Sequence, residues 1–170
     1  FYQSDFDIVG ENNDNMLADS TIIKMITEIL FAFGFNNYKI IVNHTNILRD
    51  IIINKLNVEE KYFKNICSSI DKLDKVSFDV LIPEFEKKGL NIEQINKLKL
   101  ILSENNQKNE ELDKLLNICK LWKIDDKIKF DITLARGLDY YNGVIFEVKL
   151  DNFDSSIIAG GRYDGVIPNI

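Results

Sequence analysis

The chain has 170 residues, 45% of them hydrophobic and 28% charged, a balance typical of a globular protein rather than a disordered one. A net charge of −6 argues against a general nucleic-acid coat protein, and the absence of an apolar run of 18 residues argues against a membrane span. Cys67 and Cys119 are too few and too far apart for a zinc site or a disulfide framework, so we expect small buried side chains at both positions.

The first part of the chain, residues 1–49, mixes strand and helix signals. Residues 1–10 alternate between apolar and polar side chains, which predicts a strand. A helix is expected next, capped by Asp19 or Ser20. Its apolar face should consist of Ile22, Ile26, Ile29, Leu30 and Phe33. A short strand at 38–42 should follow, and His44, directly after it, is expected to have a turn or cap role rather than a catalytic one.

Residues 50–124 contain helical patterns only. Asn57-x-x-Glu60 and Asn91-x-x-Gln94 fit the capping-box pattern, with Asn in place of Ser or Thr, and each opens a periodic segment. A last helix carries Leu112, Leu115, Leu116 and Cys119. These features predict a self-contained helical insert.

Strand patterns return in the last part of the chain, residues 125–170. Alternating or apolar runs occupy 129–135, 144–148 and 156–159. The order of strand, helix and strand, then helices, then strands predicts an α+β domain interrupted by an all-helical insertion domain. We therefore divide the chain at 1–49, 50–124 and 125–170.

Two glycine-bearing motifs stand out among the late strands. The first is Arg136-Gly137-Leu138-Asp139-Tyr140-Tyr141-Asn142-Gly143, and the second is Ala159-Gly160-Gly161-Arg162-Tyr163-Asp164-Gly165. They hold two of the three arginines in the chain, and arginine is the residue that grips a carboxylate or phosphate with two parallel hydrogen bonds. The alternatives are a structural ion pair, with Asp139 or Asp164 as partner, and an ordinary bulge or hairpin at the glycine pair.

Polar side chains on the first predicted strand offer a second candidate site. Gln3 and Asp7 lie four residues apart on one face, about 13 Å along the strand. Such a face is usually only solvated, but if other elements cover it, Asp7 and the amide oxygen of Gln3 could receive an ammonium. Tyr140 and Tyr141 add two hydroxyls, although adjacent tyrosines often pack one ring in the core. The sequence has no Cys/His nucleophile arrangement, metal-ligand cluster or phosphate loop, so no metal site is expected.

These motifs closely resemble those of histidyl-tRNA synthetases, a family of class II aminoacyl-tRNA synthetases. Residues 136–147 are similar to the first histidine-specific motif and 159–165 to the second, the A-G-G-R-Y-D-G signature. Residues 1–10 look like the closing strand of class II motif 2, and 66–76 resemble the insert of the eukaryotic type. The resemblance covers essentially the whole chain, in the right order, and implies an antiparallel class II sheet with a flanking helix.

The resemblance also implies roles for single residues. Gln3 and Asp7 would bind the α-ammonium of histidine, and Arg136 would contact its carboxylate and the α-phosphate of ATP. The imidazole pocket would be lined and walled by Tyr140, Tyr141, Gly160, Gly161 and Tyr163. In the insert, tRNA phosphates would meet Lys72, Lys75, Lys87 and Lys88, for which a solvated surface is the alternative.

The reaction implied is aminoacylation of tRNA(His) by a cytoplasmic homodimer that uses ATP with Mg²⁺, has no permanent cofactor and does not bind membranes. Motif 1, the start of motif 2, motif 3 and the anticodon-binding domain have no counterpart in the sequence, so we expect the chain alone to be an incomplete, inactive part of the catalytic region. A synthetase-like regulatory or tRNA-binding module without aminoacylation is the alternative. The joint presence of Gln3, Asp7, Arg136, Tyr140 and Tyr141 favours the enzyme.

Overall fold

The computed structural model describes residues 2–10, 16–107, 109–151, 153 and 155–164. Phe1, the loop expected at 11–15 and Gly165 lie outside these ranges. The helices are α1 (Leu17–Ala32), α2 (Thr45–Arg49), α3 (Phe63–Ile70), α4 (Phe78–Lys87), α5 (Ile92–Glu104) and α6 (Glu110–Leu121). The strands are β1 (Tyr38–His44), β2 (Ile128–Phe130), β3 (Val144–Leu150) and β4 (Ile158–Gly161). Short π and 3₁₀ turns occupy Asp50–Lys55 (η1), Glu60–Tyr62 (η2), Asp71–Asp74 (η3) and Asp125–Lys127 (η4).

The four strands form one mixed sheet in the order β2-β1-β3-β4. β3 is antiparallel to both β1 and β4, whereas β2 runs parallel to β1. The α+β class is confirmed, but the antiparallel sheet that we expected is mixed, because β2 pairs with β1 in parallel. The chain passes through five helices between β1 and β2, and a long crossover of this kind allows the parallel pairing that a short hairpin cannot.

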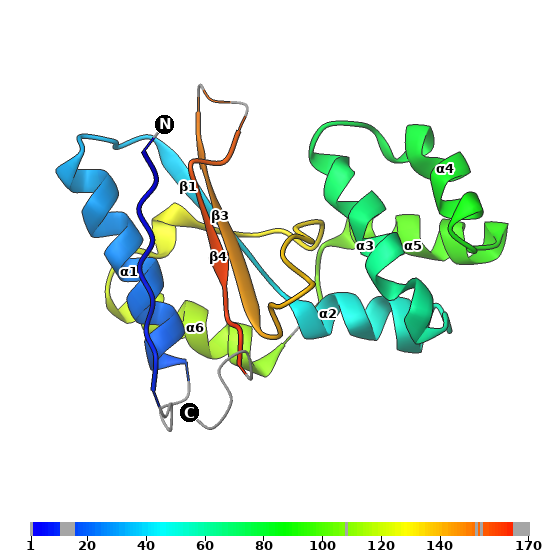
Figure 1. The fold of residues 1–170 in the computed structure, drawn as a ribbon, viewed down its shortest axis with the longest axis horizontal. Coiled ribbons are helices and arrows are strands. Elements are labelled where there is room, and N and C mark those ends of the chain that lie inside the picture. The colour runs from blue at the N-terminus through cyan, green and yellow to red at the C-terminus, as the bar shows by residue number, and fades with distance from the viewer. Residues whose placement is uncertain (1, 11–15, 108, 152, 154, 165–170) are drawn as a thin grey trace.

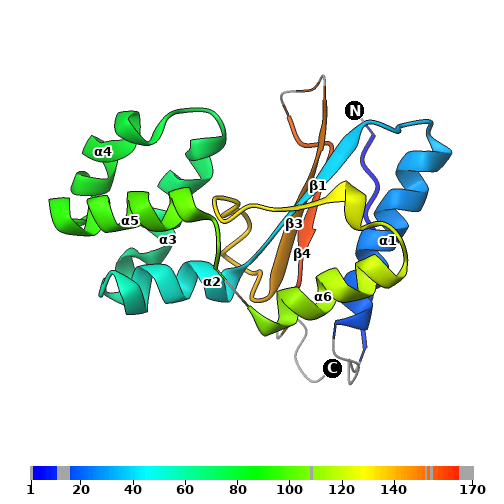
Figure 2. The same ribbon diagram turned by 180° about the vertical axis from the view of Figure 1, so that it is seen from behind.

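Two helices, α1 and α6, pack against each other and cover one face of the sheet (Figures 1 and 2). The buried residues of α1 are Ser20, Ile23, Ile26, Thr27 and Leu30. Neither predicted cap holds: the helix begins after Met16, and Ser20 donates to the Met16 carbonyl from within the first turn. The predicted apolar face is also too wide, because Phe33 lies beyond the helix end and is 77% exposed.

The N-terminal segment does not form the expected strand. Residues 2–9 run along α1 without strand pairing (Figure 1), and only Phe6 among them is partly buried. Alternation predicts an extended chain with two different faces, but a strand also requires a neighbour that supplies hydrogen bonds in register. No such neighbour is present for this segment in the part of the chain that the structure describes.

Helices α3, α4 and α5 gather beside the sheet, next to α2 (Figures 1 and 2). The capping box at Asn91 and Gln94 is confirmed, since each side chain hydrogen-bonds the other residue's backbone N–H. The pattern at Asn57 forms no box, because the φ of Asn57 is +53° and Glu60 opens only the single turn η2. Residues 50–124 as one domain stay a prediction, and the main helix neighbour of α6 is α1, which lies outside this range.

Two smaller predictions are confirmed in the interior. Cys67 and Cys119 are both free and buried. His44 is buried and caps α2: its Nδ1 accepts the Asn46 N–H at 3.1 Å, and its Nε2 lies 2.8 Å from Glu111. None of the helices in the described ranges combines the length and the apolar character that a membrane crossing requires.

Candidate functional site

A cavity of about 380 Å³ lies between residues 4–10, the start of α1 and the strand β4. Five of the predicted site residues line it, although they are distant in the sequence. They are Asp7, Tyr141, Gly160, Gly161 and Tyr163. The fold therefore brings the N-terminal segment and both glycine-bearing motifs to one place.

A hydrogen bond joins the two ends of the chain in this cavity. The Tyr163 hydroxyl donates to Oδ1 of Asp7 at 2.7 Å. This bond raises the pKa of Tyr163, because a phenol that donates to a carboxylate holds its proton more firmly. Both side chains are accessible from the cavity, so a polar ligand meets an acceptor and a hydroxyl side by side.

Tyr141 is the more buried of the cavity tyrosines. Its burial raises its pKa, the neighbouring Tyr140 hydroxyl and the negative charge of Asp7 raise it further, and the positive charge of Arg136 opposes the change. The hydroxyl therefore stays protonated near neutral pH and can donate a hydrogen bond. Tyr140 itself is 54% exposed, with its ring centroid 4.2 Å from that of Tyr141.

The glycine pair leaves room that side chains would fill. A Cβ at Gly161 would lie 2.8 Å from the Tyr141 ring, and one at Gly160 would lie 2.5 Å from the Phe146 ring. Gly137 also abuts Tyr141, since a Cβ there would lie 2.1 Å from that ring. Three glycines thus let aromatic rings lie directly on the backbone, as expected for a close approach rather than for a simple bulge.

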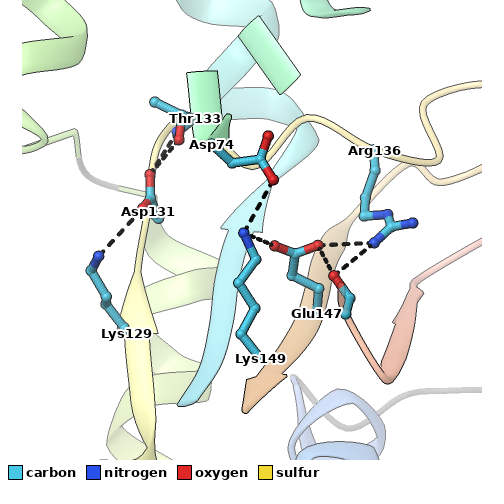
Figure 3. Close-up of polar contacts among 8 residues, drawn as sticks. Asp74, Lys129, Asp131, Thr133, Arg136, Glu147 and Lys149 are labelled. Atoms are coloured by element: carbon cyan, nitrogen blue, oxygen red, sulfur yellow. Dashed lines mark hydrogen bonds and ion pairs between the residues drawn. The ribbon is translucent and has the colours of Figure 1, made fainter. Parts of the chain in front are cut away.

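The structure places Arg136 in a different, neighbouring cavity of about 440 Å³ (Figure 3). Its Nη1 donates to Oε2 of Glu147 at 2.9 Å and to the Ser156 hydroxyl at 3.2 Å. Arg136 and Asp7 thus line separate cavities, and the charges of both affect the pKa of Tyr141. The partner of Arg136 is Glu147, not the Asp139 or Asp164 that sequence reasoning considered.

Gln3 is not brought to the cavity. It is exposed, it does not line either cavity, and its amide donates to Asp5 at 3.1 Å. Its predicted role therefore stays a prediction, without support from the geometry.

Arg162 and Asp19 also line the cavity and were not predicted from the sequence as site residues. Arg162 Nε donates to Asp164 at 2.6 Å, which is the structural pair that the sequence allowed, while Nη1 lies 3.8 Å from Asp19 at the start of α1. Burial raises the pKa of Asp19, and the charge of Arg162 opposes this. The rarity of arginine in the sequence was a signal that could have identified Arg162. Nothing local marked Asp19 as anything but a helix cap.

The predicted tRNA-binding lysines differ in their surroundings. Lys72 and Lys88 both contact Glu84, at 2.8 and 2.7 Å. Lys87 is exposed, and Lys75 is exposed at the rim of the Arg136 cavity. Within the described ranges, no group of three His, Cys, Asp or Glu side chains could hold a metal ion.

Comparisons with known proteins agree with the motifs. A family model described as histidyl-tRNA synthetase matches residues 1–170. The chain is 40% identical to the cytoplasmic histidine–tRNA ligase of Arabidopsis thaliana and 38% identical to the mitochondrial one of Homo sapiens, over 98% of its own length in each case. It spans 22% and 39% of those two proteins, well under half of either.

A solved structure shares the fold as well. The histidyl-tRNA synthetase of Nostoc sp. PCC 7120 matches with a TM-score of 0.74 and 27% identity, over 92% of this chain and 42% of that one. The match of the family model over every residue, together with the two specific motifs, shows that this chain belongs to the histidyl-tRNA synthetase family and covers part of its catalytic region.

Proposed function

We propose that this chain forms the histidine-binding part of a histidine–tRNA ligase, and that the protein containing it aminoacylates tRNA(His). The observation that carries the proposal is the cavity in which Asp7, Tyr141 and Tyr163 meet above a glycine pair. A carboxylate beside two protonated hydroxyls suits a small cationic and polar ligand such as histidine. Buried hydrogen bonds to the ligand would also reject analogues that lack its polar atoms.

Within that cavity, Asp7 is proposed to receive the α-ammonium and the tyrosines to line the imidazole pocket. The carboxylate of Asp7 is held in place by Tyr163, which leaves one of its oxygens available to a ligand. Gly160 and Gly161 would form the wall, since any side chain there would meet an aromatic ring. For Tyr140 and Gln3 the roles rest on the resemblance alone.

Arg136 is proposed, on the resemblance alone, to bind the histidine carboxylate and the α-phosphate of ATP, since it lines a separate cavity from Asp7. A carboxylate oxygen attacks the α-phosphorus, the bond to pyrophosphate breaks, and histidyl-adenylate forms; a tRNA 3′-terminal hydroxyl then attacks the acyl carbon and AMP leaves. Two anions meet in the first step, so a fixed positive charge stabilises the transition state. Mg²⁺ would accompany ATP and neutralise phosphate charge, but the described residues offer no metal-ligand cluster, so none is assigned to it.

The remaining proposals concern the larger assembly. The helical insert at 50–124 would lie against tRNA, with Lys75 and Lys87 better placed to meet phosphate than Lys72 and Lys88, which contact Glu84. A homodimer and a cytoplasmic location are proposed by analogy. The relatives include both cytoplasmic and mitochondrial proteins.

Histidine-dependent exchange of pyrophosphate into ATP, measured on the full-length protein, tests the proposal. We expect exchange with the unsubstituted protein and a loss of about 10²–10³-fold in Arg136→Gln, as for other fixed electrostatic donors. Arg49→Gln is the matched control, because Arg49 pairs with the exposed Glu60 instead. Folded, soluble protein without exchange would favour the alternative, a binding module that does not aminoacylate.

A further inference from the structure

Glu147 on β3 is the centre of a polar cluster on the sheet face opposite α1 and α6 (Figure 3). Its side chain is only 9% exposed and accepts hydrogen bonds from three partners. Oε2 receives Nη1 of Arg136 at 2.9 Å and the Ser156 hydroxyl at 2.7 Å, while Oε1 lies 3.0 Å from Nζ of Lys149. The two carboxylate oxygens are therefore divided between two cations.

The second cation is also held by the helical insert. Nζ of Lys149 lies 3.3 Å from Oδ2 of Asp74 in η3, a turn that is remote from β3 in the sequence. The same turn also lies close to Arg136, because Asp71 lines the same cavity and the positive charge of Arg136 works against the rise in the pKa of Asp71 that burial causes. One short turn of the insert thus contacts Lys149 and lies beside Arg136.

Glu147 and Lys149 are both held in their charged forms by their neighbours. Burial opposes ionisation of Glu147, yet the hydrogen bonds from Ser156, Lys149 and Arg136 leave its pKa below the ordinary value. Burial likewise opposes the charge of Lys149, but Glu147 and Asp74 leave its pKa above the ordinary value. Both groups are charged near neutral pH, so their attraction persists under working conditions.

Because Lys149 takes one oxygen of Glu147, Arg136 is bound by the other oxygen only. In the part of the chain that the structure describes, Nη1 is the only nitrogen of its guanidinium that makes a hydrogen bond. A free carboxylate tends to take an arginine with both oxygens in a fork-to-fork pair. Because Lys149 occupies Oε1, Glu147 binds Arg136 through one oxygen, and the other guanidinium N–H groups stay available.

We infer that Lys149, held by Asp74 of the insert, is a positioning residue that keeps Arg136 singly bonded to Glu147 and free to grip an anionic substrate group. This inference rests on the proposed function and adds a physical link between the helical insert and the arginine. A segment that docks on tRNA would then also determine how the arginine is presented. Removing Lys149 would let Glu147 capture the guanidinium and withdraw it from substrate.

The test is Lys149→Met in the full-length protein, assayed by histidine-dependent pyrophosphate exchange without tRNA. We expect kcat/KM for histidine to fall about 10-fold, in line with the known sensitivity of catalysis to small misplacements. Lys149→Arg should retain most activity, and Asp74→Asn should lose less than Lys149→Met. Lys129→Met is the matched control, because Lys129 faces the same cavity but pairs with Asp131 and does not reach Glu147 (Figure 3).

Repeating the substitution in an Arg136→Ala protein separates an effect on the position of Arg136 from a general loss of structure. In Arg136→Ala, Lys149→Met should cause no further loss, because its target is gone; an additional 10-fold loss there would overturn the inference, as would full activity of Lys149→Met alone. If the unsubstituted protein shows no pyrophosphate exchange, the proposed function fails. Amide hydrogen exchange then tests whether Lys149 still positions Arg136. Slower amide exchange at 135–141 in Lys149→Met than in Lys129→Met supports the inference, because Glu147 would then hold Arg136 with both oxygens, and equal or faster rates contradict it.

Discussion

Gly137, the residue after Arg136, leaves room for the Tyr141 ring to lie against its backbone. Its φ is +69°, and a Cβ would lie 2.1 Å from the Tyr141 ring. An L side chain in this conformation costs about 1 kcal/mol before any clash. Gly34 also has a positive φ, of +81°, but a Cβ at that position would have no atom within 4 Å of it.

These two glycines give a matched pair of substitutions. We expect Gly137→Ala to lower the free energy of unfolding by about 1–3 kcal/mol and to weaken histidine binding about 10-fold, since Tyr141 must move. Gly34→Ala should lose only about 1 kcal/mol of stability and bind histidine normally. Urea unfolding and equilibrium dialysis measure the two quantities. Normal histidine affinity in a folded Gly137→Ala protein would contradict the assigned place of Tyr141.

At the same scale, the sequence identified residues that line the candidate cavity better than it identified their contacts. The rarity of arginine and the density of glycine singled out both motifs, and residues from both line the cavity. The partner of Arg136 could not be foreseen, because Glu147 joins it only through the pairing of β3 within the sheet. The alternation at residues 1–10 likewise gave no information about a missing strand neighbour.

Among the elements, α4 is tied to α3 and η3 by one carboxylate. Glu84 accepts hydrogen bonds from Lys72, Lys88 and Ser69, which lower its pKa from 4.5 to about 2. A carboxyl whose pKa is lower in the folded state stabilises the protein above its unfolded pKa, and this contribution is lost as the pH falls. The pH window for this group therefore runs from about 4.5 down to about 2.

We predict that Glu84→Gln removes this part of the acid sensitivity. At pH 7 the variant should be less stable by about 1 kcal/mol, the upper range for partly exposed ion pairs, and the difference from wild type should vanish toward pH 2. Glu86→Gln, at an exposed position of the same helix, is the control. Urea unfolding at several pH values measures the difference. A gap between wild type and Glu84→Gln that stays constant across this window would be inconsistent with the low pKa.

The elements themselves were only partly predictable from local patterns. The capping box of α5 held because both of its hydrogen bonds are made within four residues. The first turn of α1 and the parallel pairing of β2 were missed, because Met16 and the pairing of Ile40 with Ile128 depend on tertiary contacts. The sequence therefore predicted where β1, β3 and β4 lie, but not how the strands pair, because pairing depends on partners distant in the sequence.

For the whole molecule, the insert should supply part of the affinity for tRNA through its exposed lysines. We predict that replacing Lys75 and Lys87 by Gln reduces the dependence of log affinity on log salt by about one unit for each lysine that meets a phosphate. Lys120→Gln on α6 is the control, since it is exposed but lies outside the cluster of α3, α4 and α5. Fluorescence anisotropy with labelled tRNA at several salt concentrations gives the slopes. Unchanged slopes would mean that these lysines are only solvated.

The arrangement of the whole chain determines the proposed histidine site, because the cavity exists only when the N-terminal segment and the second motif meet at Asp7 and Tyr163. The most direct measurement is the Kd for histidine of the full-length protein, by calorimetry, for wild type, Asp7→Asn and Tyr163→Phe. Asp7 is exposed, so its substitution should leave the fold intact, and Asp113→Asn on α6 is a matched exposed control. We predict that each cavity variant binds histidine about 10–100-fold more weakly, as expected when a hydrogen bond to a charged group is lost. Unchanged binding in a folded Asp7→Asn protein would contradict the account.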